Sequence, residues 1–243
     1  MSLDASCASK AVFISFLAVF FAANSATAKD EAKGTKAMKA AAKAKEAKDK
    51  GEAEQAEPPE PRDMAVWKSD RDHSRAIFSV AHLKFSTVTG SIGGLDAVVE
   101  EDKKDILKSN VTATLDVDTL STGVGEDKRD HHLKSDDFLA AAKFPKIKFI
   151  STKLDGEKGK PTKVKGKLTI RDVTKDVVLH IDLLSPEIKN GMGKPMRVFK
   201  AHTTINRQDY GVKWSKVVEA LPLVGDDVKI ELVVELVKQE TGA

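Results

Sequence analysis

The stretch VKGKLTIRDVTKDVVLHIDL (residues 164–183) alternates apolar and polar side chains through two runs that a short polar segment separates. Alternation with a period of two is typical of a β-strand that buries one face. The positions expected to face inward are Val164, Gly166, Leu168 and Ile170, then Val177, Leu179, Ile181 and Leu183. The stretch therefore predicts two neighbouring antiparallel strands, with His180 and Asp182 on the outer face.

The same alternation recurs at residues 111–118 and 228–237. Turn-forming pairs lie between the runs, and they suit antiparallel hairpins: Gly93-Gly94, Asp155-Gly156 and Asn190-Gly191. The segment GEDKRDHHLKSDDFLAAAKFP (residues 125–145) departs from this pattern and predicts one or two short helices, the second N-capped by Ser135. The residues thus predict an all-β protein with a helical insertion, either a barrel or a sandwich.

Composition limits the class of protein. The formal net charge is +3 and 32% of the residues are charged, which predicts a globular protein without a strong field and without a need for nucleic acid. The only cysteine, Cys7, lies in a segment that we expect to be removed. The mature chain should therefore use neither disulfides nor thiol chemistry.

The N-terminal region divides into two predicted parts. Residues 1–28 combine Lys10, an apolar run at 11–23 and an Ala-x-Ala pattern ending at Ala28, which is typical of a cleaved export signal. Residues 29–62 are rich in Lys and Ala and then in Glu and Pro, so we expect a disordered linker. Its lysines between Lys33 and Lys50 form a candidate contact with anionic membrane or cell wall, although a solvated spacer is the simpler interpretation. Residues 63–243 form the predicted folded domain.

Five ordered blocks of the domain resemble the YceI-like family. They are DHSRAIFSVAHLKFSTVTG, VTATLDVDTLST followed by RDHHLKSDDFLAAAKFPKIKFIST, VKGKLTIRDVTKDVVL, TTINRQDYGV, and VGDDVKIELVVEL. The resemblance implies an extended lipocalin-like antiparallel β-barrel of about eight strands. It also implies a periplasmic protein that holds a long isoprenoid, such as an isoprenoid quinone, or another amphiphilic lipid, for transport, storage or sensing.

Inward apolar residues are the candidates for the lipid-binding wall: Phe78, Val80, Phe85, Leu115, Phe149, Leu168, Leu179, Phe199, Ile205 and Trp214. Arg129, His131, His132 and Arg207 are the candidates for contact with a lipid head group. Each set has a structural alternative, because the apolar residues can fill a packed core and the polar residues can form ordinary hydrogen bonds.

No metal site, cofactor or catalytic residue is predicted. His73 and His82 are an odd number of residues apart, so on one strand they would face opposite sides. The adjacent His131 and His132 also diverge on a helix. The chain has no Gly-x-Ser-x-Gly, phosphate-loop or His-Glu-x-x-His motif. A lipid-binding protein is favoured over a barrel enzyme for a small amphiphile and over a structural envelope protein with a filled barrel; whether it forms a homodimer stays open.

Overall fold

The computed structural model describes residues 62–124, 126–157, 159–218 and 220–240. The predicted signal peptide and all of the predicted linker except Arg62 lie outside these residues. Within the described part, no helix has the length and apolar character needed to cross a bilayer.

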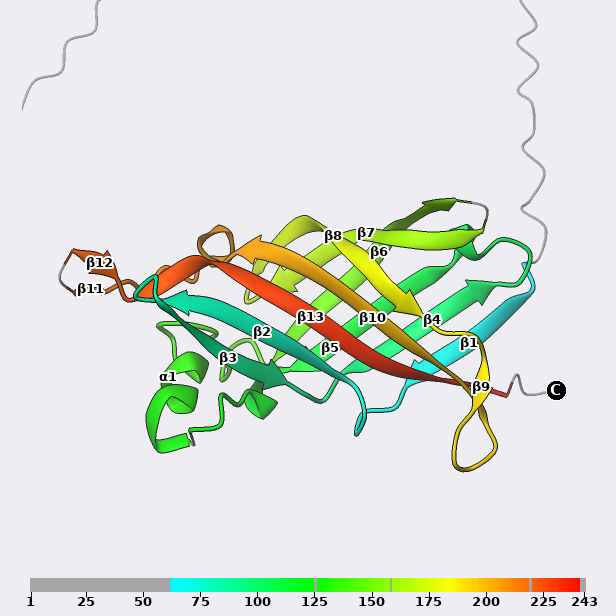
Figure 1. Cartoon of the computed structure of the whole chain (residues 1–243), viewed down its shortest axis with the longest axis horizontal. Helices are drawn as coiled ribbons and strands as arrows, with labels where there is room; N and C mark the ends of the chain where they lie inside the picture. Colours follow the sequence, from blue (N-terminus) through cyan, green and yellow to red (C-terminus); the bar gives the residue numbers. More distant parts are fainter. Residues whose placement is uncertain (1–61, 125, 158, 219, 241–243) are drawn as a thin grey trace, which may run out of the picture. The chain divides into compact units, whose positions relative to one another are not determined.

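Eight of the described strands form a closed antiparallel ring, which confirms the predicted barrel (Figure 1). Each strand pairs with the next along the ring, and the last pairs with the first. In ring order the strands are β13 (Val224–Lys238), β1 (Met64–Ser69), β4 (Asp96–Asp102), β5 (Asn110–Asp116), β6 (Lys146–Glu157), β7 (Lys160–Ile170), β8 (Val173–Leu184) and β10 (Pro195–Asn206).

A hairpin extends one side of this ring. Strand β13 pairs with β1 near its C-terminal end, where Trp67 lies opposite Lys238. Over the rest of its length β13 pairs with β2 (Arg75–His82), and β2 pairs with β3 (Ser86–Ile92). Strands β1 and β2 therefore follow one another along the same edge of β13.

The shorter elements define the two ends of the barrel. We call one the α1 end, because it carries α1 (His131–Lys134) and the hairpin of β11 (Val217–Val218) and β12 (Leu221–Pro222) (Figure 1). The other is the β9 end, named for β9 (Ile188–Lys189), which pairs with the beginning of β10. Strand β10 runs from the β9 end to the α1 end (Figure 1).

The helical insertion contains one short α-helix, in agreement with the one or two short helices that the sequence predicts. A π-helical turn, η3 (Glu126–Asp130), leads into the single turn of α1. Ser135 ends this helix, because its hydroxyl donates a hydrogen bond to the His132 carbonyl at 2.8 Å, and its predicted role as the N-cap of a second helix is wrong. The residues that follow form turns, with Ala140 at a φ of 50° that a helix cannot contain. The 3₁₀ turns are η1 (Ile106–Lys108), η2 (Val117–Thr119) and η4 (Arg207–Tyr210).

Two local strand predictions are also wrong. Asp155-Gly156 was expected at a turn but lies inside β6, which runs on to Glu157. In β8, Ile181 and Leu183 pair with consecutive residues of β10, so Asp182 has no partner there and forms a bulge. The extra residue reverses the alternation. Leu183 is 41% exposed, and Leu184 lines the interior in its place.

Candidate functional site

A cavity of about 280 Å³ lies inside the barrel, and every strand of the ring contributes side chains to its wall. The wall includes Arg197 near the beginning of β10 and Arg207 just after its end. The two residues are ten steps apart along the chain, which at roughly 3.3 Å per residue corresponds to on the order of 33 Å of strand. Most of the wall is aliphatic or aromatic. The cavity is therefore long, narrow and apolar.

Eight of the ten predicted wall residues line this cavity: Phe78, Val80, Leu115, Phe149, Leu168, Leu179, Phe199 and Ile205. Their strands alternate as predicted, which places them on the inner face. Their contact with a lipid stays a prediction. Sequence reasoning missed Trp67, Phe138 and Tyr210, which also line the cavity. The alternation of Ala65, Trp67 and Ser69 along β1 was the signal that could have revealed Trp67.

Phe85 does not belong to the wall. Its side chain is 86% exposed, although the alternation of β2 and β3 suggested an inward position. Leu83 and Lys84 have φ values of 50° and 63°, so they form a left-handed turn between the two strands. The turn interrupts the alternation before β3 begins, and Phe85 therefore points to solvent.

Trp214 is likewise absent from the residues that line the cavity. It follows η4 at the α1 end, outside any strand. Its ring lies 5.2 Å from the rings of both His132 and Phe138, measured between centroids. Phe138 does line the cavity, so Trp214 supports the wall at this end without being part of it.

Two glycines keep the inner wall open. A Cβ atom on Gly166 would lie 2.4 Å from the Phe149 ring, and one on Gly90 would lie 2.4 Å from the Phe78 ring. Each phenyl ring therefore lies against the backbone of the neighbouring strand, where only a glycine leaves room. Because the rings pack against the wall, they leave space along the middle of the barrel.

Arg207, which was a candidate for contact with a lipid head group, instead stabilises the α1 end through its own hydrogen bonds. It is 6% exposed and lines the cavity. Its guanidinium donates to the carbonyls of Gly225 at 2.9 Å, Val212 at 2.7 Å and Trp214 at 2.8 Å. It also forms an ion pair with Asp226 at 2.8 Å. These bonds join η4 to the beginning of β13 and leave Arg207 little capacity for a ligand.

The other three predicted head-group residues do not line the cavity. Arg129 Nε donates to Thr122 Oγ1 at 2.8 Å, and His131 is exposed. His132 Nε2 lies 2.9 Å from the Asp137 carboxylate. The turns of η3 and α1 direct these side chains toward their own loops, so the cluster seen in the sequence is not a cluster at the cavity.

The neighbouring Asp130 has a structural role in the same insertion. Burial raises its pKa, but hydrogen bonds from Thr122 and Ser121 outweigh that effect and hold the pKa of Asp130 below its ordinary value. The charged carboxylate thereby fastens η3 to the segment that follows η2.

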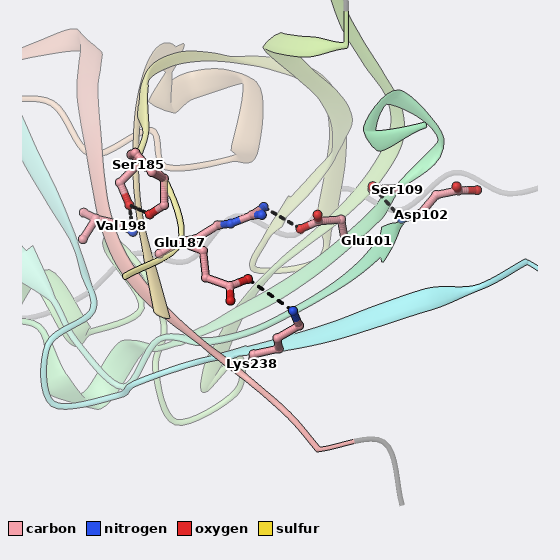
Figure 2. A network of polar contacts seen from close by, with 9 residues as sticks. Glu101, Asp102, Ser109, Ser185, Glu187, Val198 and Lys238 are labelled. Atoms are coloured by element: carbon pink, nitrogen blue, oxygen red, sulfur yellow. Dashed lines mark hydrogen bonds and ion pairs between the residues drawn. The ribbon is translucent and has the colours of Figure 1, made fainter. Parts of the chain in front are cut away.

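Sequence reasoning missed a polar group at the β9 end of the cavity. Arg197 Nη1 lies 2.7 Å from Glu101 Oε2, and Lys238 Nζ lies 3.2 Å from Glu187 Oε2; Figure 2 shows Glu101, Glu187 and Lys238 together at this end. Both cations lie close to the indole of Trp67: Arg197 Cζ is 4.6 Å and Lys238 Nζ is 5.3 Å from a ring centroid. Both distances are within the range of cation–π contacts. Three of these residues, Trp67, Glu101 and Arg197, line the cavity and come from β1, β4 and β10, so no local sequence motif predicts this group.

Outside the cavity, Asp70, His73 and Glu235 place their ligand atoms within 4.8 Å of one another. The Nδ1 atom of His73 lies 3.1 Å from Asp70 and 4.0 Å from Glu235. A hydrogen bond from His73 lowers the pKa of Asp70, and the same contact raises the pKa of His73. His82 lies apart from this group and contacts Ser86 at 3.3 Å. The partly exposed cluster connects the β1–β2 loop to β13.

Most of the barrel domain matches the model of a known protein family. The YceI-like domain model matches residues 67–236, which is more than half of the chain. The chain belongs to the YceI-like family. A UPF0312 protein of Staphylococcus aureus is 33% identical over 164 residues, covering 67% of this chain and 91% of the relative.

Two solved structures share the fold. BcnA of Burkholderia cenocepacia is 20% identical with a TM-score of 0.58, over 69% of this chain and 98% of BcnA. A domain from Saccharophagus degradans, described as polyisoprenoid-binding and implicated in plant cell wall breakdown, is 15% identical with a TM-score of 0.51. That match covers 73% of this chain and all of the domain.

Proposed function

We propose that this protein holds the chain of an isoprenoid or another long amphiphilic lipid inside its barrel. The observation that carries the proposal is the apolar cavity, whose wall extends from the β9 end to the α1 end. Each buried CH₂ group contributes ~0.8 kcal/mol, so a long tail supplies affinity without a strong polar contact. The YceI-like family and the polyisoprenoid-binding description of the Saccharophagus degradans domain support the same function.

The character of the wall favours binding over catalysis. Tyr210 is a titratable residue that lines the cavity, and burial raises its pKa to about 12, so it carries no charge near neutral pH. The two arginines of the wall, Arg197 and Arg207, are each paired with a carboxylate, at opposite ends of the cavity. We further propose that the protein is exported to the periplasm, on the pattern of residues 1–28, and carries, stores or senses its lipid there. The proposed contact of the lysine-rich linker with anionic surfaces lies outside the described residues.

Native mass spectrometry of the protein tests this function directly. The mature chain is purified from its own cell envelope without detergent, and bound molecules are then extracted and identified. We expect a discrete added mass that corresponds to one long-chain lipid. A ligand-free mass that persists after incubation with isoprenoid quinones and polyprenyl lipids would overturn the proposal.

A matched pair of variants on β6 assigns the binding to the cavity. Phe149→Glu puts a charge on the inner wall, whereas Ile150→Glu puts the same charge on the next residue, which is 57% exposed on the outer face. We expect Phe149→Glu to lose the lipid and Ile150→Glu to keep it, because an unpaired charge is costly only where water is excluded. If Phe149→Glu fails to fold, Ala113→Phe narrows the same cavity with an apolar side chain. Equal lipid retention by a folded inner variant and Ile150→Glu would contradict the assignment.

A further inference from the structure

The ring of strands is paired along only part of the boundary between β8 and β10. The partners in this ladder end at His180, which lies opposite His202. Beyond that pair, β8 extends back to Val173 and β10 extends forward to Asn206. Among the residues that the structure describes, neither extension has a partner across this boundary. We call this part of the boundary, toward the α1 end, the open seam.

A groove of about 600 Å³ lies along the open seam. Its wall comes from β8, β10 and η4, and three of its residues, Thr203, Ile205 and Tyr210, also line the cavity inside the barrel. Lys175 of β8 lies opposite Leu168, which lines the cavity, so these two residues are on the same face of the sheet. Lys175 is nevertheless exposed and lines the groove. The inner face of β8 is therefore accessible from outside at this point.

Side-chain packing separates the groove from the cavity. Tyr210 belongs to a core cluster with Ile205 of β10, and Val173 and Val177 of β8 pack against the same cluster. Tyr210 is 2% exposed, so its ring fills the space between the two strands. A ladder of backbone hydrogen bonds resists separation of two strands, whereas a packed side chain can change its rotamer while the strands stay in place. The open seam is therefore the part of this boundary that opens most easily.

The two ends of the barrel, by contrast, are crossed by hydrogen bonds from charged side chains. At the β9 end, the ion pair of Arg197 and Glu101 joins β10 to β4, and β13 and β1 lie between these strands in the ring. At the α1 end, Arg171 Nη1 donates to the carbonyls of Phe138 at 3.3 Å and Gly211 at 3.1 Å. These two bonds join the β7–β8 turn to the helical insertion and to the segment after η4. Passage through either end would break charge-assisted hydrogen bonds, which are roughly twice as strong as neutral ones.

We propose that the lipid enters and leaves the cavity through the side of the barrel, at the groove along the open seam, and that Tyr210 is the side chain that moves to admit it. The lipid chain passes from the groove into the cavity beside Thr203, Ile205 and Tyr210, which line both. This inference rests on the proposed function and adds the route of lipid exchange to it. Lys175 lies in the groove but not in the cavity wall, so a modification there obstructs the route and leaves the wall unchanged.

Compact adducts at three exposed positions test this route on the full chain. Cys7→Ser removes the only natural cysteine, and Lys175→Cys, Ile188→Cys or Val217→Cys then adds one at the groove, the β9 end or the α1 end. Each variant is modified with a maleimide that carries a bulky adamantyl cage, or with N-methylmaleimide as the small control. Stopped-flow fluorescence measures the uptake of all-trans-retinol and of cis-parinaric acid, two lipids that fluoresce more strongly in apolar surroundings.

The adamantyl adduct on Lys175→Cys should slow the uptake of both probes by about tenfold or more, because it obstructs the step that limits association. We expect the equilibrium affinity of the same adduct to stay within about twofold of the wild type, since Lys175 is outside the cavity wall. The small adduct on Lys175→Cys, and the adamantyl adducts on Ile188→Cys and Val217→Cys, should change the uptake rate by less than about twofold.

A pair of matched variants tests the role of Tyr210. Tyr210→Leu and Phe138→Leu each replace an aromatic side chain of the cavity wall with the same smaller one, but of the two residues only Tyr210 also lines the groove. We expect Tyr210→Leu to take up both probes about fivefold faster than Phe138→Leu, because the smaller side chain leaves the open seam less obstructed.

The outcomes separate this inference from the function on which it rests. If neither probe binds the wild-type protein, the proposed lipid-binding function fails. If the probes bind and an adamantyl adduct at either end slows uptake as much as the adduct in the groove, the route through the side of the barrel is overturned. An adduct on Lys175→Cys that weakens equilibrium binding as much as it slows uptake would make the groove part of the binding site. Equal uptake rates for Tyr210→Leu and Phe138→Leu would contradict the role of Tyr210.

Discussion

Two arginines at opposite ends of β10 line the same cavity, yet their hydrogen bonding differs. Arg207 donates to three backbone carbonyls and to Asp226. Arg197 donates to Glu101, and its Nε is buried without an acceptor. The difference comes from the local backbone: η4 and the segment after it turn carbonyls toward Arg207, whereas the ladders around Arg197 engage theirs. A buried arginine is therefore structural or available according to the carbonyls around it, and residue type alone does not distinguish the two.

Removal of the α1-end arginine should have the largest effect on stability. Arg207→Met leaves three carbonyls and Asp226 without their donor, so we expect the free energy of unfolding to fall by about 3 kcal/mol. Urea unfolding followed by circular dichroism measures this change. The exposed Arg75 provides the control, since Arg75→Met should have little effect. An Arg207→Met variant as stable as the wild type would remove the contrast between the two ends.

At the β9 end, the ion pair of Arg197 and Glu101 should contribute less to stability than Arg207 does at the α1 end. We expect Arg197→Met with Glu101→Gln to unfold within about 1 kcal/mol of the wild type, because replacement of both partners leaves no unpaired charge. Arg197→Met alone should be less stable than the double variant, because it leaves the mostly buried Glu101 carboxylate without its cation. The same urea measurement compares them. A double variant as unstable as Arg207→Met would show that the β9 end is also primarily structural.

The connection between β1 and β2 carries the cluster of Asp70, His73 and Glu235, and a change there should have the smallest effect on stability. Asp70 and Glu235 raise the pKa of His73 above its ordinary value of 6.5, so the protonated form stabilises the fold. That stabilisation is complete below pH 6.5 and is lost as the pH rises through the folded-state pKa of His73. In thermal melts from pH 5 to 9, we expect the melting temperature of the wild type to be higher than that of His73→Asn at low pH. This difference in melting temperature should shrink as the pH increases. A difference that grows with pH would contradict this role.

The barrel was predictable because its signal is local. Alternation along β7 and β13 identified the inner face, and a strand can place side chains only on alternate sides of the sheet. The predictions of inward-facing positions failed where the chain left that rule. Phe85 lies beyond a left-handed turn, Leu183 follows a bulge, and Trp214 is outside the strands.

The amino-acid sequence by itself determined the strands, their inner faces and the apolar character of the wall, because each depends on the spacing of side chains along one segment. Only the tertiary structure decided which polar groups face the cavity. Trp67, Glu101 and Arg197 line it and come from β1, β4 and β10, which the closed ring brings together. The structural role of Arg207 depends on backbone carbonyls outside η4, at Trp214 and Gly225. Whether a donor is free depends on its neighbours in space, which side-chain spacing along the chain does not specify.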